Sequence, residues 1–219
     1  MLKFLRVYFT CFTLLHAGVL LTAAAASDGS MSLLPRQINP TNLNFANSQW
    51  IWTNEVPANS STPVTAPVGT RAFRKTFSPP QGKIPFNFFI AVATDNNGTL
   101  FVNGKQITVS PDWLHPQTFC VSNFNPTINV IALNVTNQPG NTGPNANPAG
   151  LLVAARVLYL DGTTTDIVSD ASWRFSLTVP PGFESLTFDD SPWSTATTEG
   201  KVPISPWGNV TILNNATIC

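Results

Sequence analysis

Residues 86–109, FNFFIAVATDNNGTLFVNGKQITV, constrain the fold more than any other part of this chain. Eight of the first nine are apolar, aromatic or β-branched, which is the composition of a strand buried on both faces. Asn-Gly pairs at 97–98 and 103–104 flank the short apolar run at 100–102. Because both central residues of a type I′ turn need a positive φ, Asn-Gly suits a two-residue hairpin. The stretch therefore predicts three consecutive antiparallel strands joined by two tight turns.

Similar β-favouring runs recur through the rest of the chain. They cover residues 48–53, 70–77, 118–121, 127–135, 151–160, 163–168, 173–179 and 210–213. Pro, Gly and Asn separate these runs, most densely at 137–150. No segment of ten or more residues carries a helical stripe, and about nine or ten short strands favour an all-β sandwich or jelly roll.

Four of the six tryptophans are predicted to lie in the core, because they fall in strands or recur after an Asp-x-Ser pattern. These are Trp50, Trp52, Trp173 and Trp193. Side chains alternate along a strand, so Trp50 and Trp52 are expected on one face of the first strand, with Ile51 on the other.

The first 26 residues have the features of a secretory signal peptide. Lys3 and Arg6 precede a long apolar run at 7–21, and alanines at 23–26 offer a cleavage site. The alternative is a membrane anchor, but the run is short for a span of about 20 residues. We therefore predict a secreted, extracellular protein. Its parts would be the signal peptide at 1–26, an extended lead-in at 27–47, one β-sandwich domain at 48–213 and a tail at 214–219.

Charge is sparse in this sequence. Charged residues make up 10% of the chain, against about 25% in an average soluble protein. Cleavage after residue 26 would leave nine basic and eleven acidic residues, with no basic cluster of the kind that binds nucleic acid. N-x-S/T acceptors favour a glycosylated surface, although Asn125 is excluded because Pro126 follows it. The five acceptors are Asn59, Asn97, Asn134, Asn209 and Asn215.

Two cysteines would remain after cleavage, Cys120 and Cys219. In an oxidising compartment two cysteines most simply form one disulfide. This bridge would tether the last residue of the chain to its middle. The alternative is that Cys219 pairs with another molecule.

The common catalytic constellations are missing from the predicted mature chain. His115 is its single histidine, and no G-x-S-x-G elbow presents a serine nucleophile. One histidine and two cysteines do not make a zinc site, and no phosphate-binding glycine motif occurs. A glycosidase needs two carboxylates at a set separation, but most carboxylates here sit in turn contexts such as Asp161-Gly162.

Two groups of residues could form a binding site. Asp95, Asn96 and Asn97 place oxygen ligands at a strand end, and Asp112 lies in the next loop; hard oxygen donors suit Ca²⁺. A structural turn would explain the same residues. Trp113 and Trp207 lie in loop contexts, where an exposed indole ring could pack against the C–H face of a sugar. Edge packing is the alternative for both.

The order of several blocks resembles the galactose-binding-domain-like jelly roll. The blocks are SQWIWT, TRAFRKTF, AVATDNNGTLFVNGKQI, INVIALNV, NPAGLLVAARVLYLDGTTTDIVSDASWRF, DDSPWSTA and PWG, and they span residues 48–212. The likeness is to the domain that accompanies the catalytic part of α-L-rhamnosidase-like enzymes, and to stand-alone secreted fungal versions. It implies a β-sandwich that binds carbohydrate in its loops, sometimes with a structural Ca²⁺, and it includes no hydrolase domain. Asp95 matches the residue before the hairpin strand in this pattern.

These observations predict a secreted, non-catalytic, lectin-like module. Its partner would be a cell-wall or glycoprotein glycan, and it would act as a monomer, with no required cofactor, although calcium is possible. The candidate ligand-binding residues are Trp113, Asp112, Trp207, Asp95 and Asn96. One alternative is a structural or host-interaction surface protein that binds no sugar. A second is a small glycoside hydrolase that uses a carboxylate pair.

Overall fold

The computed structural model describes residues 43–58, 65–109, 111–122, 124–140 and 147–213. These residues belong to one unit, residues 34–219. They form twelve strands and no helix, and so contain no helix that could span a membrane. The predicted signal peptide, most of the lead-in and the C-terminal tail lie outside the described residues.

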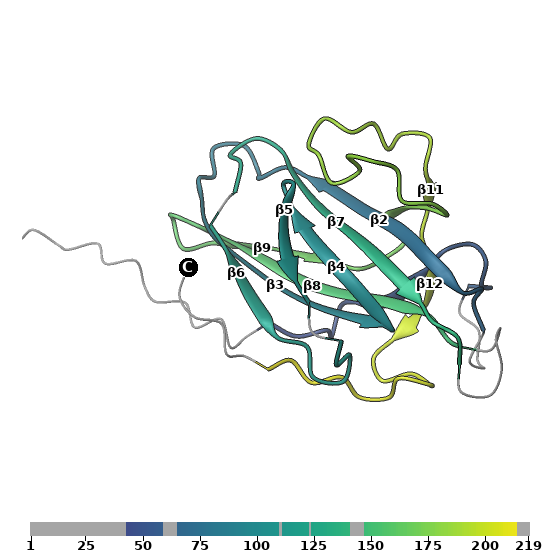
Figure 1. The fold of residues 1–219 in the computed structure, drawn as a ribbon. Helices are drawn as coiled ribbons and strands as arrows, with labels where there is room; N and C mark the ends of the chain where they lie inside the picture. Colours follow the sequence, from purple (N-terminus) through teal and green to yellow (C-terminus); the bar gives the residue numbers. More distant parts are fainter. Residues whose placement is uncertain (1–42, 59–64, 110, 123, 141–146, 214–219) are drawn as a thin grey trace, which may run out of the picture. The chain divides into compact units, whose positions relative to one another are not determined.

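The strands form two antiparallel sheets that face each other (Figure 1). The first sheet has the order β12 (Thr197–Lys201), β1 (Gln49–Trp52), β8 (Gly150–Tyr159), β3 (Pro85–Asp95), β6 (Thr118–Val121), and β9 (Thr164–Val168) also pairs with β8. The second sheet has the order β11 (Ser194–Thr195), β10 (Arg174–Ser176), β2 (Gly69–Phe77), β7 (Asn129–Asn137), β4 (Asn97–Val102), β5 (Lys105–Thr108). The predicted all-β sandwich is confirmed.

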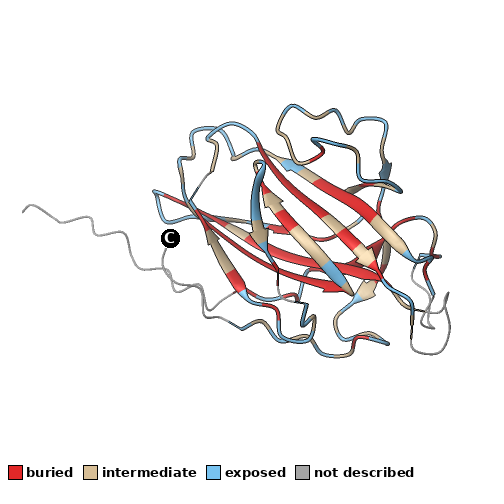
Figure 2. Ribbon diagram, in the orientation of Figure 1, coloured by how far each residue is buried: buried red, intermediate tan, exposed pale blue. Residues whose placement is uncertain are grey.

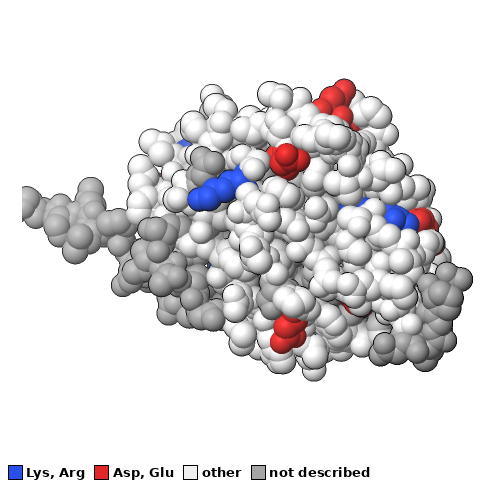
Figure 3. Space-filling model, viewed as in Figure 1, with Lys and Arg blue, Asp and Glu red and all other residues white. Residues whose placement is uncertain are grey.

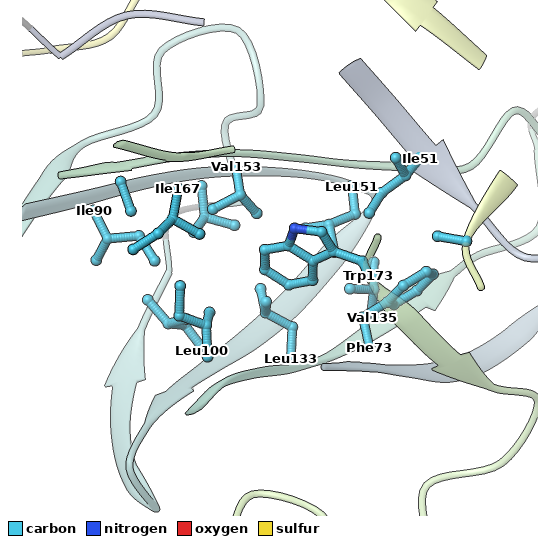
Figure 4. Close-up of a cluster of buried hydrophobic side chains, with 14 of the residues drawn as sticks. Ile51, Phe73, Ile90, Leu100, Leu133, Val135, Leu151, Val153, Ile167 and Trp173 are labelled. Carbon is cyan, nitrogen blue, oxygen red and sulfur yellow. The ribbon is translucent and has the colours of Figure 1, made fainter. Parts of the chain in front are cut away.

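The hydrophobic core lies between the two sheets. The central strands β3 and β8 are buried along most of their length (Figure 2). Trp173 is fully buried among aliphatic residues of both sheets, including Leu133 and Val153 (Figure 4). Its indole N–H donates to the carbonyl of Val168 at 2.8 Å, so the polar atom of this large side chain is satisfied.

One of the two predicted turns is confirmed and the other is wrong. At Asn103-Gly104 the φ angles are 51° and 79°, and the pair joins β4 to β5 as a tight hairpin. Asn97-Gly98 instead begins β4, which pairs with β7 in the second sheet, whereas β3 belongs to the first sheet. A Cβ at position 98 would lie 2.6 Å from Cγ2 of Thr94. Close packing, and not a positive φ, therefore requires this glycine.

The expected alternation in β1 is also wrong. Trp52 packs with Ile51 in the core between the sheets, whereas Trp50 packs on the outer face of the first sheet. The register between β1 and β12 shifts at this point, because Trp50 pairs with Gly200 while Ile51 pairs with Thr198. The pairing is irregular here, so period-two alternation does not carry through the strand. The prediction that these two tryptophans are core residues is confirmed, since both are 0% exposed.

Most other predicted strands are found within a few residues of their expected limits. Residues 210–213 are an exception, because they form only an isolated parallel bridge between Gln117 and Leu213. The polar strands β11 and β12 were not predicted, since their residues carry no apolar alternation.

Irregular segments cover the outer face of each sheet. Residues 43–45 and 202–212, with the buried ring of Trp207, pack on the first sheet. The segment that contains Phe183, Phe188 and the half-buried Trp193 packs on the second sheet. Hydrophobic packing therefore extends beyond the space between the sheets, and the packed part of the chain begins before Ser48.

Candidate functional site

Four strand ends meet at one end of the sandwich (Figure 1). Asp95, the last residue of β3, pairs with Gly150, the first residue of β8. Asn97, the first residue of β4, pairs with Thr136 near the end of β7. Asn96 lies between the two sheets at this point, and the Asp95–Asn96 peptide bond is cis. The register of the sheets therefore brings the predicted polar pair Asp95 and Asn96 to the loop-bearing end of the fold.

The carboxylate of Asp95 is held from the side of the first sheet by a pair of tryptophans. Nε1 of Trp207 donates a hydrogen bond to Oδ2 of Asp95 at 2.9 Å. The Trp207 ring stacks on Trp50, with ring centroids 4.3 Å apart and planes 18° apart. A Cβ on Gly150 would lie 2.6 Å from the Trp50 ring and 2.8 Å from the Trp207 ring. Glycine at position 150 thus leaves the space that the stacked rings fill beside Asp95.

Asn96 is fixed by the loop between β7 and β8. Its Oδ1 accepts hydrogen bonds from the backbone N–H of Gln138 and from Nδ2 of Asn147, each at 2.7 Å. Asn147 also donates to Oδ1 of Asn137 at 3.2 Å. The orientation of the Asn96 amide is therefore set by two donors, and its Nδ2 group donates to none of the described residues.

A second carboxyl group, that of Glu199, is buried in the same region. Glu199 is the extra residue of the irregularity in β12, because the pairing with β1 passes from Gly200 directly to Thr198. Bulges of this kind redirect a side chain. Glu199 is 8% exposed, and its Oε2 has no hydrogen-bond partner among the described residues.

Burial raises the pKa values of both carboxyl groups, and the charge of Asp95 adds to the rise at Glu199. Burial raises the pKa of Asp95, and the hydrogen bond from Trp207 opposes that rise. Burial, followed by the charge of Asp95, raises the pKa of Glu199 from 4.5 to about 8. At neutral pH, Glu199 therefore holds a proton.

Trp207 is not the exposed aromatic residue that its loop context predicted. It is 4% exposed, because one ring face is stacked on Trp50 and residues of the C-terminal covering surround it. Trp113 is half-buried, and its ring meets Trp50 edge-on, with centroids 6.5 Å apart. Both predicted tryptophans therefore join one cluster around Trp50, and Trp113 is its more accessible member.

Asp112 is exposed and bonds within its own loop. Its carboxylate contacts Nδ1 of His115 at 3.0 Å and accepts the backbone N–H of Leu114 at 3.1 Å. The hydrogen bond with His115 is the main reason that the pKa of Asp112 is lowered. These two bonds join Asp112 to its own loop, and its role in ligand binding stays a prediction.

Sequence reasoning missed Glu199, Asn147 and Gly150. A glycine inside a strand-like run can indicate a bulge, and Glu199-Gly200 was such a signal. The need for glycine at position 150 comes from the packing of the Trp50 and Trp207 rings, which no local sequence pattern reveals. Asn147 lies in a loop rich in Asn, Pro and Gly, where no local pattern separates a fixed amide from a solvated one.

The remaining predicted modification sites are distributed over several elements. Asn97 and Asn209 are exposed, Asn134 is half-buried, and Asn59 and Asn215 lie outside the described residues. Cys120 on β6 is disulfide-bonded. Its predicted partner, Cys219, lies outside the described residues, so the pairing stays a prediction.

Acidic and basic residues are sparse and scattered on the face of the molecule drawn in Figure 3. In the described part of the chain, no group of three or more His, Cys, Asp or Glu residues is placed to hold a metal ion. A cation near Asp95 would therefore depend on carbonyl, amide, water or ligand oxygens in addition to carboxylates.

Comparison with solved structures supports the fold and points to carbohydrate. The lectin of Pleurotus ostreatus in complex with GalNAc is 32% identical with a TM-score of 0.68, over 78% of this chain and 47% of the lectin. The α-L-rhamnosidase of Streptomyces avermitilis complexed with L-rhamnose is 26% identical with a TM-score of 0.66, over 77% of this chain and 16% of the enzyme. The apo form of the Pleurotus lectin matches with the same identity and TM-score as the complex.

This chain thus spans about half the length of the lectin and about a sixth of the enzyme. No family model matches the chain, and no curated protein matches it in sequence. The predicted likeness to a galactose-binding-domain-like jelly roll, as in rhamnosidases and a fungal lectin, is confirmed.

Proposed function

We propose that this chain is a non-catalytic, lectin-like module that binds carbohydrate at the end of the sandwich formed by Asp95 and Asn96. The observation that carries the proposal is a fixed acceptor beside a fixed donor. Trp207 occupies Oδ2 of Asp95, and two N–H groups occupy Oδ1 of Asn96. Oδ1 of Asp95 and Nδ2 of Asn96 have no partner among the described residues. Neighbouring sugar hydroxyls, which both donate and accept, suit such a pair.

The site would act by pre-organisation. The hydrogen bonds to Asp95 and Asn96 come from Trp207, Gln138 and Asn147, so the two side chains are already oriented without a ligand. A site that is ordered beforehand loses less conformational freedom on binding. Trp113, the accessible member of the tryptophan cluster, would offer its ring to the apolar face of the sugar. The likeness to a lectin solved with GalNAc supports the same ligand class.

Calcium is proposed as an optional component of this site. Asp95 and Glu199 bring two carboxyl groups to this region, and Glu199 offers a buried oxygen that has no partner among the described residues, so the local chemistry suits a hard cation. Asp95 would hold the ion, with Glu199 available to help if it loses its proton. When bound, the ion would neutralise the carboxylates and attract sugar hydroxyls. Calcium-dependent thermal stabilisation that is lost in Asp95→Asn would support this proposal, and equal melting temperatures with calcium and with a chelator would contradict it.

A glycan array and titration calorimetry with GalNAc test the proposed function. We expect Asp95→Asn and Asn96→Ala to lose binding by tenfold or more, since each removes about 1.4 kcal/mol or more of a directed interaction. Asp189→Asn is the matched control, because Asp189 is an exposed turn residue that bonds only its own turn. Absence of binding to every glycan, with and without calcium, would contradict the proposal and favour a structural or host-interaction protein.

One observation favours the glycoside hydrolase alternative. Glu199 has a raised pKa beside the carboxyl group of Asp95, and glycoside hydrolases use such a pair as a general acid and a second, ionised carboxylate. Both side chains are more than nine-tenths buried and Trp207 occupies one oxygen of Asp95, so we favour binding. Release of sugar by the wild type that Glu199→Gln abolishes would reverse this preference.

We further propose that the protein is secreted, glycosylated and monomeric. The N-terminal sequence pattern and the N-x-S/T acceptors support this proposal, and two of those acceptors are exposed on the fold. Secretion into the medium by the full-length chain, with a mass that falls on treatment with an endoglycosidase, would test the first two parts, and the native mass in solution would test the third.

A further inference from the structure

Asn97 stands directly beside the proposed carbohydrate site. It follows Asn96 in the chain, so the two Cα atoms are about 3.8 Å apart. Leu100 and Val102 face the core between the sheets and Phe101 faces outward, so alternation along β4 points Asn97 and Thr99 to the outer surface of the second sheet. The Asn97 side chain is exposed and makes no hydrogen bond within the part of the chain that the structure describes.

The backbone at Asn97 is rigidly placed. Asn97 pairs with Thr136 and the following Gly98 pairs with Val135, so the sequon lies in the strand ladder and not in a loose loop. A glycan attached here would start from a fixed point at the rim of the Asp95–Asn96 end. Its first sugars would project from the second sheet, on one side of the site.

The other described acceptors lack this combination of exposure and position. Asn134 is half-buried, and its Oδ1 accepts the backbone N–H of Thr99 at 3.1 Å. Asn209 is exposed, but it lies in the segment that covers the first sheet, two residues after Trp207, and adjoins neither Asp95 nor Asn96 in the chain. Only Asn97, among the described acceptors, adjoins a residue of the proposed site.

We propose that Asn97 carries an N-linked glycan that selects which carbohydrates reach the Asp95–Asn96 site. This inference rests on the proposed function. An N-linked glycan is bulky and well hydrated, so it excludes ligands that must continue past it. The terminal unit of a short glycan enters from the open side. An internal segment of a polysaccharide has to run across both sides of the site, and the Asn97 glycan blocks one of them.

The residue pair Thr99→Ala and Thr99→Ser gives a matched test. Both alter the same half-buried strand position and keep the backbone bond to Asn134, but only alanine destroys the sequon. The full chain is produced in a eukaryotic secretory host, and glycopeptide mass spectrometry measures occupancy at Asn97. Binding is then measured on an array that presents each sugar both as the end of a short oligosaccharide and as an internal unit of a polysaccharide.

We expect Thr99→Ala to gain about fivefold or more in signal on polysaccharides, while its signal on short oligosaccharides stays within about twofold. Thr99→Ser should match the wild type on both. Wild-type protein trimmed by an endoglycosidase to a single remaining sugar should behave like Thr99→Ala, which removes the concern that a substitution affects folding. Removal of the other exposed sequon by Asn209→Gln should leave the ratio of the two signals unchanged.

An unmodified Asn97 in the secreted protein would overturn the inference. Equal polysaccharide binding by Thr99→Ala and Thr99→Ser would also overturn it, while leaving the proposed function intact. Failure of every variant to bind any carbohydrate would overturn the proposed function, and this inference with it.

Discussion

Arg74 and Glu199 are both buried ionisable residues, but their surroundings differ. Arg74, on the second sheet, donates to Oδ2 of Asp190 at 2.8 Å and to three backbone carbonyls of the covering segment, those of Phe183, Ser185 and Phe188. Its guanidinium group also lies over the Phe188 ring, 5.2 Å from the centroid. The hydrogen bonds of the Arg74 guanidinium group thus hold residues 183–190 against the second sheet.

Glu199, near the first sheet, has the opposite character. One of its oxygens is buried without a partner among the described residues, and the charge of Asp95 repels it. A buried group in this state costs stability, whereas Arg74 contributes to it. The comparison suggests that the covering of the second sheet is structural, and that the covering of the first sheet is a support for a binding site.

The largest effect is expected from removing Arg74. Arg74→Ala would leave Asp190 and several carbonyls without their donor and open a cavity, so we expect a loss of about 3–5 kcal/mol in the free energy of unfolding. Urea denaturation measures it. Arg174→Ala is the control, because Arg174 is only partly buried and bonds a single carbonyl closely, that of Trp193 at 2.7 Å. Equal losses for the two variants would contradict a special role for Arg74.

A smaller loss is expected from Gly150→Ala. The added methyl group would lie 2.6 Å from the Trp50 ring, so the stacked rings must move, at a cost of about 1–3 kcal/mol. Because Trp207 holds Asp95, carbohydrate binding should weaken in parallel. Gly162→Ala provides a contrast in which a Cβ meets nothing within 4 Å, although its φ of +80° strains the backbone. A loss of stability without a loss of binding in Gly150→Ala would show that the tryptophan pair does not support the site.

The raised pKa of Glu199 predicts how stability depends on pH. The folded state holds the Glu199 proton up to pH about 8, whereas the unfolded chain releases it near 4.5. The contribution of Glu199 to the free energy of unfolding is therefore fully present below pH 4.5. It declines as the pH rises toward 8, by at most about 1.4 kcal/mol per pH unit. Glu199→Gln cannot ionise, so its stability relative to the wild type should improve steadily over that range.

Thermal unfolding at pH 5 and pH 9, in the presence of a chelator, checks this prediction. Asp189→Asn is the control, because the pKa of this exposed residue is lowered by its bonds to Ser191 and its contribution changes in a different pH range. A difference between Glu199→Gln and the wild type that is the same at both pH values would contradict the assignment of the pH dependence to Glu199.

Local rules predicted the fold well and the site only in part. The hairpin at Asn103-Gly104 needs a positive φ at both residues, and that requirement is visible in two letters of sequence. The glycine at position 98 also follows an asparagine but serves packing against Thr94, a contact that depends on which sheet each strand joins. The same holds for Trp207, whose burial follows from a stack with Trp50, more than 150 positions earlier in the sequence.

The smallest effect is expected from Trp207→Phe, which separates the two functions of the tryptophan. Phenylalanine keeps a ring to stack on Trp50 but lacks the N–H that bonds Asp95 at 2.9 Å. We expect about 1–2 kcal/mol of lost stability from the smaller ring and the missing hydrogen bond. Without that bond nothing opposes the effect of burial, so the pKa of Asp95 should rise further and carbohydrate binding should weaken below neutral pH. A binding profile with an unchanged pH dependence would mean that Trp207 acts by packing alone. The segment that covers the first sheet would then have a structural role, as the segment that covers the second sheet does.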